Sequence, residues 1–312
     1  MRVHVVLNAH AGALLRGKRQ SAVGAVAGAF QRAGLAAQIE CAEPALLEAT
    51  VAAAAKRADI VVVGGGDGSL RSAAAVLAQQ HAALGVLPLG TFNHFAKDLG
   101  IPLDVDGAAQ AIATGRTAPR DIAAVNGRIF INHAAVGLYP HMVDERERLR
   151  GARGLGKFPA MALAIAGVLR LYPTFGLQIR IAGEARARRS PFLFVANNRY
   201  ILDACGLERR ERADKLMLLV AHDAGRWALF RMGMKALLGR LGKDAYDSFA
   251  FERAVIASRR ERLLVELDGE VEALEPPLEF TLLPGALRVV RPGGVDVGTG
   301  PRKLEGMERP AA

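Results

Sequence analysis

The sequence predicts an α/β protein made of two domains. Over residues 1–120, short apolar segments alternate with alanine-rich helical windows, which is typical of a parallel sheet with helices on both faces. Over residues 121–292, apolar residues recur at every second position, which indicates a mainly antiparallel β-sandwich interrupted by helical inserts. With 312 residues, 51% of them apolar, the chain can bury a core in each domain. Residues 293–312 are rich in glycine, proline and charge, and we expect them to form a mobile tail.

The elements of the first domain follow in chain order. Strands are expected at 3–8, 36–40, 60–63 and 84–88, and helices at 18–33, 44–57, 69–80 and 105–114. In such a sheet the turns that follow the strands meet at one edge, where open α/β sheets bind ligands.

The second domain shows shorter and more numerous strand patterns. These are expected at 121–125, 128–133, 176–181, 192–197, 216–221, 254–257, 263–268, 278–283 and 287–291. Helical inserts are expected at 140–150, 158–171 and 226–238.

The third strand leads into a turn with four glycines around one carboxylate, which we interpret as a phosphate-binding turn. Its residues are Gly64, Gly65, Gly66, Asp67, Gly68, Ser69 and Leu70. Glycines let the backbone reach φ > 0 and come close to a ligand, so that their N–H groups can point at an anion, while a helix beginning at Ser69 faces its positive end toward the same anion. A Walker loop would need a lysine, and the dinucleotide fingerprint would need a glycine at position 69. A glycine-rich loop without a ligand stays an alternative.

Two other turns follow strands of the same sheet. After the first strand come Asn8, Ala9, His10, Ala11 and Gly12, whose amide and backbone groups can donate hydrogen bonds. After the fourth strand, Gly90 permits a tight turn, Thr91 offers a hydroxyl, and Asn93 is expected to cap the next helix. Both turns should lie beside the glycine turn.

A fourth motif lies far along the chain, at the end of a strand in the second domain. Here Asp268 and Glu270 flank Gly269. Alternation places both carboxylates on one side of the strand, unless Gly269 forms a bulge and separates them. Such a pair can supply a general base and a ligand for a metal or a hydroxyl group. An ordinary charged hairpin turn is the alternative.

In this order, the four motifs resemble the diacylglycerol kinase catalytic family, whose pattern is Asn-Pro-x-x-Gly, Gly-Gly-Asp-Gly-Thr/Ser, Pro-x-Gly-Thr-x-Asn-Asp-x-x-Arg and Asp-Gly-Glu. The resemblance runs from residue 3 to residue 292. It implies an ATP-dependent kinase that phosphorylates a lipid hydroxyl, with the nucleotide on the first domain and the lipid toward the second. It further implies that ATP binds at 8–12, 64–70, Thr91 and Asn93, and that Glu270, next to Asp268, is the general base.

The same resemblance implies Mg²⁺. Asp67 and Asp121 would hold one ion through water, and Asp214 would bind a second ion elsewhere in the second domain. The chain departs from the family pattern at His94, where the family has aspartate, and neutral imidazole is a poor ligand for Mg²⁺. The metal ion could instead be held by Asp67, Asp121 and Asp268. His94 itself could bind a phosphate or be a solvated helix cap. The alternative is that the enzyme has weakened activity. Ala9 also replaces a family proline.

The net charge of +10 is unevenly placed. Residues 1–125 hold 11 basic against 9 acidic side chains, and the remainder holds 30 against 22. The basic second part favours an acidic partner such as an anionic membrane surface, although arginine-rich coding bias would look the same. The helix at 158–171, flanked by Arg148, Arg150, Arg153 and Lys157, either contacts anionic lipid or covers the sandwich core.

The composition also narrows the location and the partners. Two cysteines make no disulfide framework, the first residues read as a strand rather than a signal peptide, and no uninterrupted apolar stretch is long enough to span a bilayer. We therefore expect a cytoplasmic protein, peripheral at most at the inner membrane face. Nucleic-acid binding is not expected, because aromatic residues make up only 5% and no recognition motif is present. The oligomeric state stays open, a homodimer included.

Two other functions stay open. An NAD kinase shares the glycine–aspartate motif and the two-domain plan, but it is recognised by an asparagine–glutamate motif where this chain has Gly90, Thr91, Phe92 and Asn93. The second is that of a non-catalytic relative that binds a nucleotide or a membrane. Its main support is His94, which stands where the family has an aspartate.

Overall fold

The structure is a computed structural model that describes residues 1–12, 19–78, 80–137, 174–197, 215–223 and 246–293, with single positions at 225, 227, 228 and 231. Several expectations lie outside these residues. They are the helices at 140–150 and 158–171 with their basic flanks Arg148, Arg150, Arg153 and Lys157, most of 226–238, the ligand Asp214, and the tail beyond residue 293.

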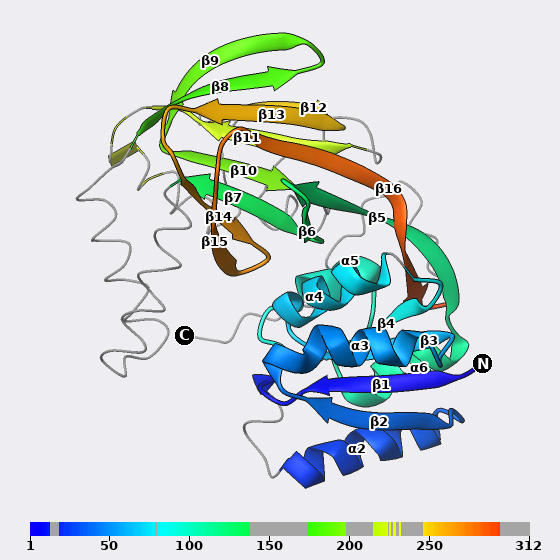
Figure 1. The fold of residues 1–312 in the computed structure, drawn as a ribbon. Coiled ribbons are helices and arrows are strands. Elements are labelled where there is room, and N and C mark those ends of the chain that lie inside the picture. The colour runs from blue at the N-terminus through cyan, green and yellow to red at the C-terminus, as the bar shows by residue number, and fades with distance from the viewer. Residues whose placement is uncertain are drawn as a thin grey trace, which may run out of the picture.

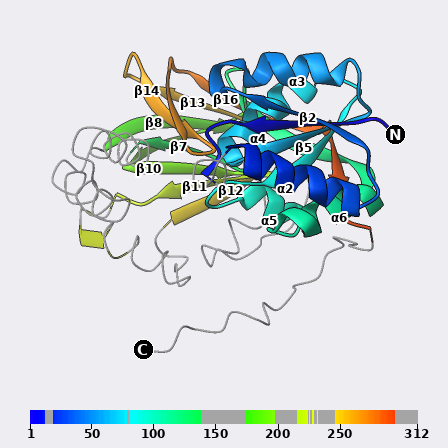
Figure 2. The ribbon, with the colours of Figure 1, turned by 90° about the horizontal axis from the view of Figure 1, so that it is seen from below.

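The first domain is a parallel sheet between two layers of helices. Its strands are β1 (Val3–Asn8), β2 (Ala37–Ala42), β3 (Ile60–Gly65) and β4 (Ala83–Pro88), in the order β2-β1-β3-β4. Every residue of β3 and β4 is buried, as expected for strands covered on both faces. The longer helices are α2 (Arg19–Arg32), α3 (Leu47–Ala55), α4 (Asp67–Leu77) and α6 (Val105–Thr114). Figure 2 shows α2 and α6 on one face of the sheet and α3 on the other, where it packs against α4.

Two long strands join the domains. β5 (Arg116–Val125) and β16 (Leu278–Arg291) pair antiparallel, and β16 also lies parallel to β4 through Val289 and Leu84. A ten-stranded sheet therefore runs through both domains (Figure 1). Eight of its strands follow in the order β2-β1-β3-β4-β16-β13-β8-β9, and the other two branch from it, since β5 pairs with β16 and the short β6 (Arg128–Phe130) pairs with β5. The expected division at residue 120 falls inside β5, and the last residues of β16 complete the sheet of the first domain.

The second domain packs the far half of that sheet, with β13 (Arg253–Ser258), β8 (Phe175–Ile181) and β9 (Glu184–Ser190), against a second sheet. The second sheet is antiparallel and consists, in spatial order, of β12 (Tyr246–Phe251), β11 (Leu216–Ala221), β10 (Phe192–Ala196), β7 (His133–Gly137), β14 (Leu263–Leu267) and β15 (Glu270–Leu274). Between the sheets lies an apolar core in which Phe130 contacts the edge of Phe280, with ring centroids 6.3 Å apart. The predicted fold class is confirmed.

Some predicted elements differ in detail. The helix expected at 69–80 begins two residues earlier, at Asp67, and the strand expected at 128–133 is split between β6 (Arg128–Phe130) and β7. The two last predicted strands are one strand, β16, whose pairing with β5 shifts register between Leu283 and Leu287. The sequence did not predict β9 because it is an exposed edge strand, rich in arginine and without apolar alternation.

Candidate active site

The glycine turn lies between β3 and α4, and its glycines are required by space. A Cβ atom on Gly64 would lie 2.4 Å from the Leu7 side chain, and one on Gly65 would lie 2.5 Å from the Ser69 hydroxyl oxygen. No glycine of this turn has positive φ, and Gly66 is extended at φ −91° and ψ −177°. This turn therefore does not use the left-handed backbone that glycine permits. Glycine is needed at Gly64 and Gly65 because neighbouring side chains lie too close to leave room for a Cβ atom.

The turns after β1, β3 and β4 meet at one edge of the sheet. The Asn8 side chain donates a hydrogen bond of 2.7 Å to the Ser69 hydroxyl and accepts one of 2.9 Å from the His10 backbone N–H. On the other side, a Cβ atom on Gly90 would lie 2.5 Å from the Cα atom of Gly66. The structure thus brings the three predicted turns together at the carboxyl ends of their strands.

The predicted nucleotide ligands differ in how much of each side chain they expose. Leu70, Ala9 and Ala11 are buried in the core, so only their backbone groups can face a ligand. Thr91, Gly12 and His10 are exposed, and His10 lies 3.2 Å from Glu43.

Asp67 caps the short helix α5 (His94–Leu99), a role the sequence assigned to Asn93. The Asp67 carboxylate accepts hydrogen bonds from the backbone N–H groups of His94 (3.2 Å) and Phe95 (3.0 Å), and from the side chain of Asn132 (3.2 Å). Asn93 occupies the N-cap position with a left-handed backbone, φ 53°, but its side chain bonds both backbone groups of Gly90 at 3.0 Å. Asp67 therefore fixes the glycine turn, α5 and the second domain relative to one another.

Asp268 binds the turn between β6 and β7. Its carboxylate accepts three backbone hydrogen bonds, from Ile131 (2.7 Å), Asn132 (2.8 Å) and His133 (3.1 Å). Burial raises the pKa of this carboxyl to about 6, although the charge of His133 and the three N–H groups oppose the rise. Asp268 thus orients the backbone of the hairpin that carries Glu270.

Glu270 reaches from the second domain to the glycine turn. It begins β15, and in Figure 1 the β14–β15 hairpin points toward α4. A Cβ atom on Gly68 would lie 2.7 Å from the Glu270 Oε1 atom, and the Arg71 side chain of α4 donates a hydrogen bond to Oε2. Arg71 also donates to Glu272 at 2.9 Å. The carboxylate predicted to be the base therefore touches the turn predicted to hold phosphate.

A buried ion pair stands behind this hairpin. Glu266 is fully buried, accepts a hydrogen bond from the Gly269 backbone N–H, and lies 3.3 Å from Nε2 of His133. Burial has the largest influence and favours a neutral imidazole, but the charge and hydrogen bond of Glu266 together with the charges of Asp268 and Asp67 outweigh it and raise the pKa of His133. Glu266 thus holds the turn that presents Glu270, and protonation of His133 compensates its charge.

Replacing Glu266 by Gln is expected to cost about 1–3 kcal/mol of unfolding free energy at pH 6. A group whose pKa is raised on folding stabilises the protein fully below its unfolded value, near 6.5, and loses that contribution as the pH rises through the folded value. The cost should therefore shrink between pH 6 and pH 9, as measured by urea unfolding of both proteins. An equal cost at both pH values would contradict the pairing. Glu275→Gln, which removes an exposed carboxylate, is the control.

Asp67 and Asp121, the two predicted metal ligands that the structure describes, accept hydrogen bonds from different parts of the backbone. The Asp121 carboxylate accepts a 2.7 Å hydrogen bond from the Gly285 backbone, at the register shift of β16. His94 stacks on Phe92, and burial lowers the pKa of its imidazole, which keeps it neutral at pH 7. Within the described ranges, no three carboxylate, histidine or cysteine side chains lie close enough together to hold a metal ion. The described residues alone therefore do not make a Mg²⁺ site.

The sequence analysis missed three residues of the site. Arg71 follows Asp67 by one helical turn, a spacing that could have placed it beside the glycine turn. Asn132 lies between β6 and β7 and His133 begins β7, and neither carries a recognisable motif, so only the fold shows that they contact Asp67 and Asp268.

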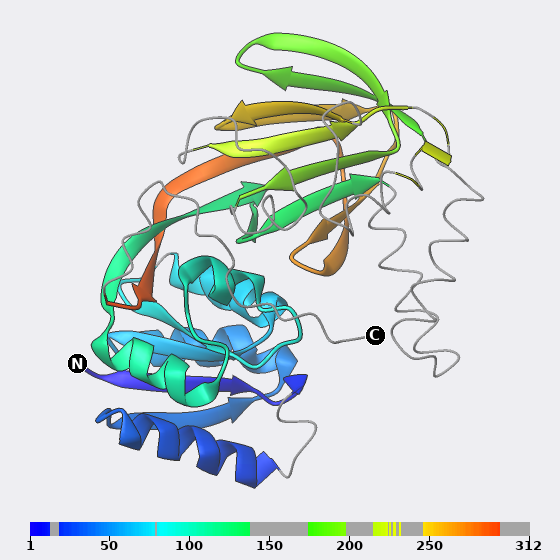
Figure 3. The same cartoon turned by 180° about the vertical axis from the view of Figure 1, so that it is seen from behind.

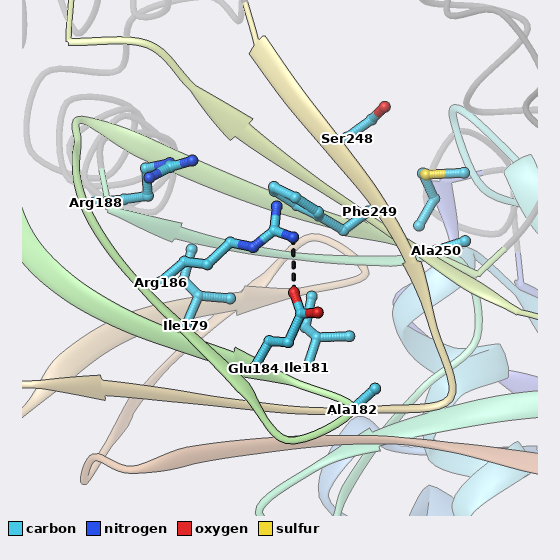
Figure 4. Close-up of a pocket in the computed structure, with 10 residues that line it drawn as sticks. Ile179, Ile181, Ala182, Glu184, Arg186, Arg188, Ser248, Phe249 and Ala250 are labelled. Atoms are coloured by element: carbon cyan, nitrogen blue, oxygen red, sulfur yellow. Dashed lines mark hydrogen bonds and ion pairs between the residues drawn. The ribbon is translucent and has the colours of Figure 1, made fainter.

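A cavity of about 410 Å³ lies elsewhere, between β8 and β9 on one side and β11 and β12 on the other. Figure 4 shows its apolar walls, which include Ile179 and Ile181, and the Arg186 guanidinium between Glu184 (2.8 Å) and the Phe249 ring (5.2 Å to the centroid). The β8–β9 hairpin lies at the end of the molecule away from the first domain (Figures 1 and 3). No residue of the four motifs lines this cavity, so we place phosphate chemistry at the glycine turn.

Comparisons with known proteins point to one family. The family model for the diacylglycerol kinase catalytic domain matches residues 2–125. A probable lipid kinase YegS-like from Pseudomonas aeruginosa (strain UCBPP-PA14) is 32% identical over 240 residues, which cover 73% of this chain and 75% of the relative. The chain belongs to the diacylglycerol kinase family of lipid kinases. A YegS-like relative from Klebsiella pneumoniae (strain 342) is 38% identical over a shorter stretch, 38% of this chain and 39% of its own.

Solved structures show that this lipid kinase shares its fold with other members. The crystal structure of a putative diacylglycerol kinase from Bacillus anthracis str. Sterne superposes with a TM-score of 0.75 and 22% identity, covering 94% of this chain and 98% of that one. Within its described residues, the kinase has no helix that is both long and apolar enough to cross a membrane.

Proposed function

We propose that this lipid kinase transfers the γ-phosphate of ATP to a hydroxyl group of diacylglycerol or a related lipid. One observation carries the proposal: Glu270 of the second domain lies against Gly68 of the glycine turn. A base must be within hydrogen-bond reach of the proton it removes, and the phosphate acceptor must meet the phosphate donor. The contact between these two motifs supports a reaction in which both conditions are met at one place.

The proposed reaction uses the chain's own groups for binding and proton transfer. The backbone N–H groups at the start of α4 bind the phosphates of ATP, supported by Asn8 and Thr91 at the neighbouring turns. The lipid oxygen attacks the γ-phosphorus, the bond from that phosphorus to the bridging oxygen breaks, and ADP leaves. Glu270 takes the proton of the lipid hydroxyl. The products are therefore a phosphorylated lipid and ADP.

We include Mg²⁺ in the proposal because the resemblance to the family implies it. It would neutralise phosphate charge, and most of its ligands would have to be phosphate oxygens and water, which is how Mg²⁺ commonly binds in kinases. Asp67 and Asp121 stay its proposed protein ligands. The neutral His94 adds no negative charge where the family has an aspartate.

The lipid is proposed to bind toward the second domain, taken from an anionic membrane surface by a kinase that works in the cytoplasm. Basic residues support this view, because 30 of the 41 lysines and arginines follow residue 125. We propose no nucleic-acid partner, and a homodimer stays a proposal.

The acceptor can be tested directly. ADP release should be measured by a coupled assay with diacylglycerol, sphingosine, ceramide and NAD offered separately in mixed micelles. We expect turnover with a lipid, diacylglycerol first among them. Turnover with NAD alone would replace the proposal by an NAD kinase, and nucleotide binding without any turnover would favour a non-catalytic relative.

A further inference from the structure

Arg71 links the first domain to the candidate base. It lies on α4, one turn after Asp67, and its side chain is only 12% exposed. One guanidinium nitrogen donates to Glu272 at 2.9 Å, and the other donates to Oε2 of Glu270. Burial lowers the pKa of Arg71, but the two carboxylates outweigh burial and raise it, so the guanidinium stays charged.

The Glu270 carboxylate touches two features that bind anions. Its Oε2 atom meets the Arg71 guanidinium, and its Oε1 atom would lie 2.7 Å from a Cβ atom on Gly68, in the first turn of α4. The Glu270 carboxylate therefore lies between the Arg71 guanidinium and the positive, N-terminal end of α4. The Glu270 carboxylate thus occupies an anion-binding position of the type that a phosphate group of ATP would occupy.

The contact with Glu270 is the more exposed of the two ion pairs that Arg71 makes. Glu270 is 55% exposed, and ion pairs with exposed partners contribute little to stability. Glu272, which is 27% exposed, already gives Arg71 a partner and lies next to Arg128 at 3.6 Å. The Arg71–Glu270 pair can therefore open while Glu272 keeps the guanidinium in place.

We propose that Arg71 is a ligand of the γ-phosphate, and that the Arg71–Glu270 ion pair is a resting state that ATP opens. This inference rests on the proposed function. The planar fork of arginine fits phosphate oxygens as well as carboxylate oxygens. When the γ-phosphate takes one side of the guanidinium, Glu270 is released and can accept the proton of the lipid hydroxyl. The base then becomes available only after the phosphate donor has bound.

The proposal predicts a loss of discrimination between ATP and ADP. Arg71→Gln should weaken binding of a non-hydrolysable ATP analogue by about 10-fold to 100-fold, the usual range for hydrogen bonds to a charged group. Binding of ADP, which lacks the γ-phosphate, should change less than about threefold. Arg71→Lys should fall between the two, since it keeps the charge and loses the fork. Competition with a fluorescent nucleotide measures all of these affinities.

Arg128→Gln is the matched control, because Arg128 also contacts Glu272 but is exposed. It should leave both affinities and turnover unchanged. If Arg71→Gln weakens the ATP analogue and ADP equally, or weakens neither, the proposal is wrong; thermal unfolding of each variant shows whether it is folded. A wild-type protein that binds ATP more tightly than ADP through Arg71, yet phosphorylates no lipid, would instead overturn the proposed function alone.

Discussion

Replacing Glu270 by Gln is expected to lower kcat for lipid phosphorylation by about 10²-fold to 10⁴-fold, the usual contribution of a general base. Glutamine keeps the size of the side chain and an oxygen that can accept from Arg71, but it cannot take the proton of the lipid hydroxyl. Binding of ATP should not weaken, because the substitution removes a negative charge beside the phosphate site. Initial rates over a range of lipid and ATP concentrations separate kcat from the two KM values.

The same substitution at Glu275 is the matched control for this result. Glu275 follows β15 directly and pairs with Arg262 at 3.5 Å, and both side chains are exposed. Glu275→Gln should leave kcat unchanged. If Glu270→Gln retains the wild-type kcat while remaining folded, the lipid hydroxyl loses its proton to another group and the assignment of the base is wrong.

The second large effect is expected at Gly90, where the turn after β4 contacts the glycine turn. An alanine Cβ would lie 2.5 Å from the Cα atom of Gly66 and 2.8 Å from the Asn93 side-chain oxygen. The first neighbour is backbone and cannot rotate away, so the glycine turn and the turn after β4 must separate. Gly90→Ala should lower kcat/KM for ATP by about 10²-fold, since a displacement near 1 Å costs that much in a positioned site, and should cost about 1–3 kcal/mol of unfolding free energy.

Gly24→Ala tests whether the loss at Gly90 comes from the contact. Gly24 lies in α2 of the same domain, and a Cβ atom there meets nothing within 4 Å. That substitution should leave kcat/KM unchanged and stabilise the protein by about 0.5–1 kcal/mol. Wild-type kinetics in Gly90→Ala would show that the two turns do not have to touch for ATP to bind.

The meeting of the three turns of the first domain could be predicted from the sequence because it follows from the sheet. Turns after parallel strands share one edge, so Asn8, Asp67 and Thr91 had to be neighbours once β1, β3 and β4 were recognised. The approach of Glu270 could not be derived in this way. It depends on β5 and β16, which join the two domains, and their pairing spans more than 150 residues of chain.

The roles of individual side chains were harder to predict. Asn93 is a good helix cap by residue type, but its left-handed backbone turns the side chain toward Gly90, and Asp67 caps α5 instead. Glycine type indicated a close approach of the backbone to a ligand, whereas the atoms that crowd Gly64 and Gly65 in the structure belong to Leu7 and Ser69. In both cases the role of the residue depends on a neighbour from another helix or strand. The local sequence pattern gives no information about that neighbour.

The central claim is that this kinase moves the γ-phosphate of ATP onto a lipid hydroxyl at the contact between the glycine turn and Glu270. The most direct measurement incubates the purified protein with γ-labelled ATP and a total bacterial lipid extract, then separates and identifies the labelled products by mass spectrometry. We predict one labelled class of phosphorylated lipid, formed by the wild type and by Glu275→Gln and absent with Glu270→Gln. Label that appears in no lipid, or in the same lipid at the same rate with Glu270→Gln, would contradict the account.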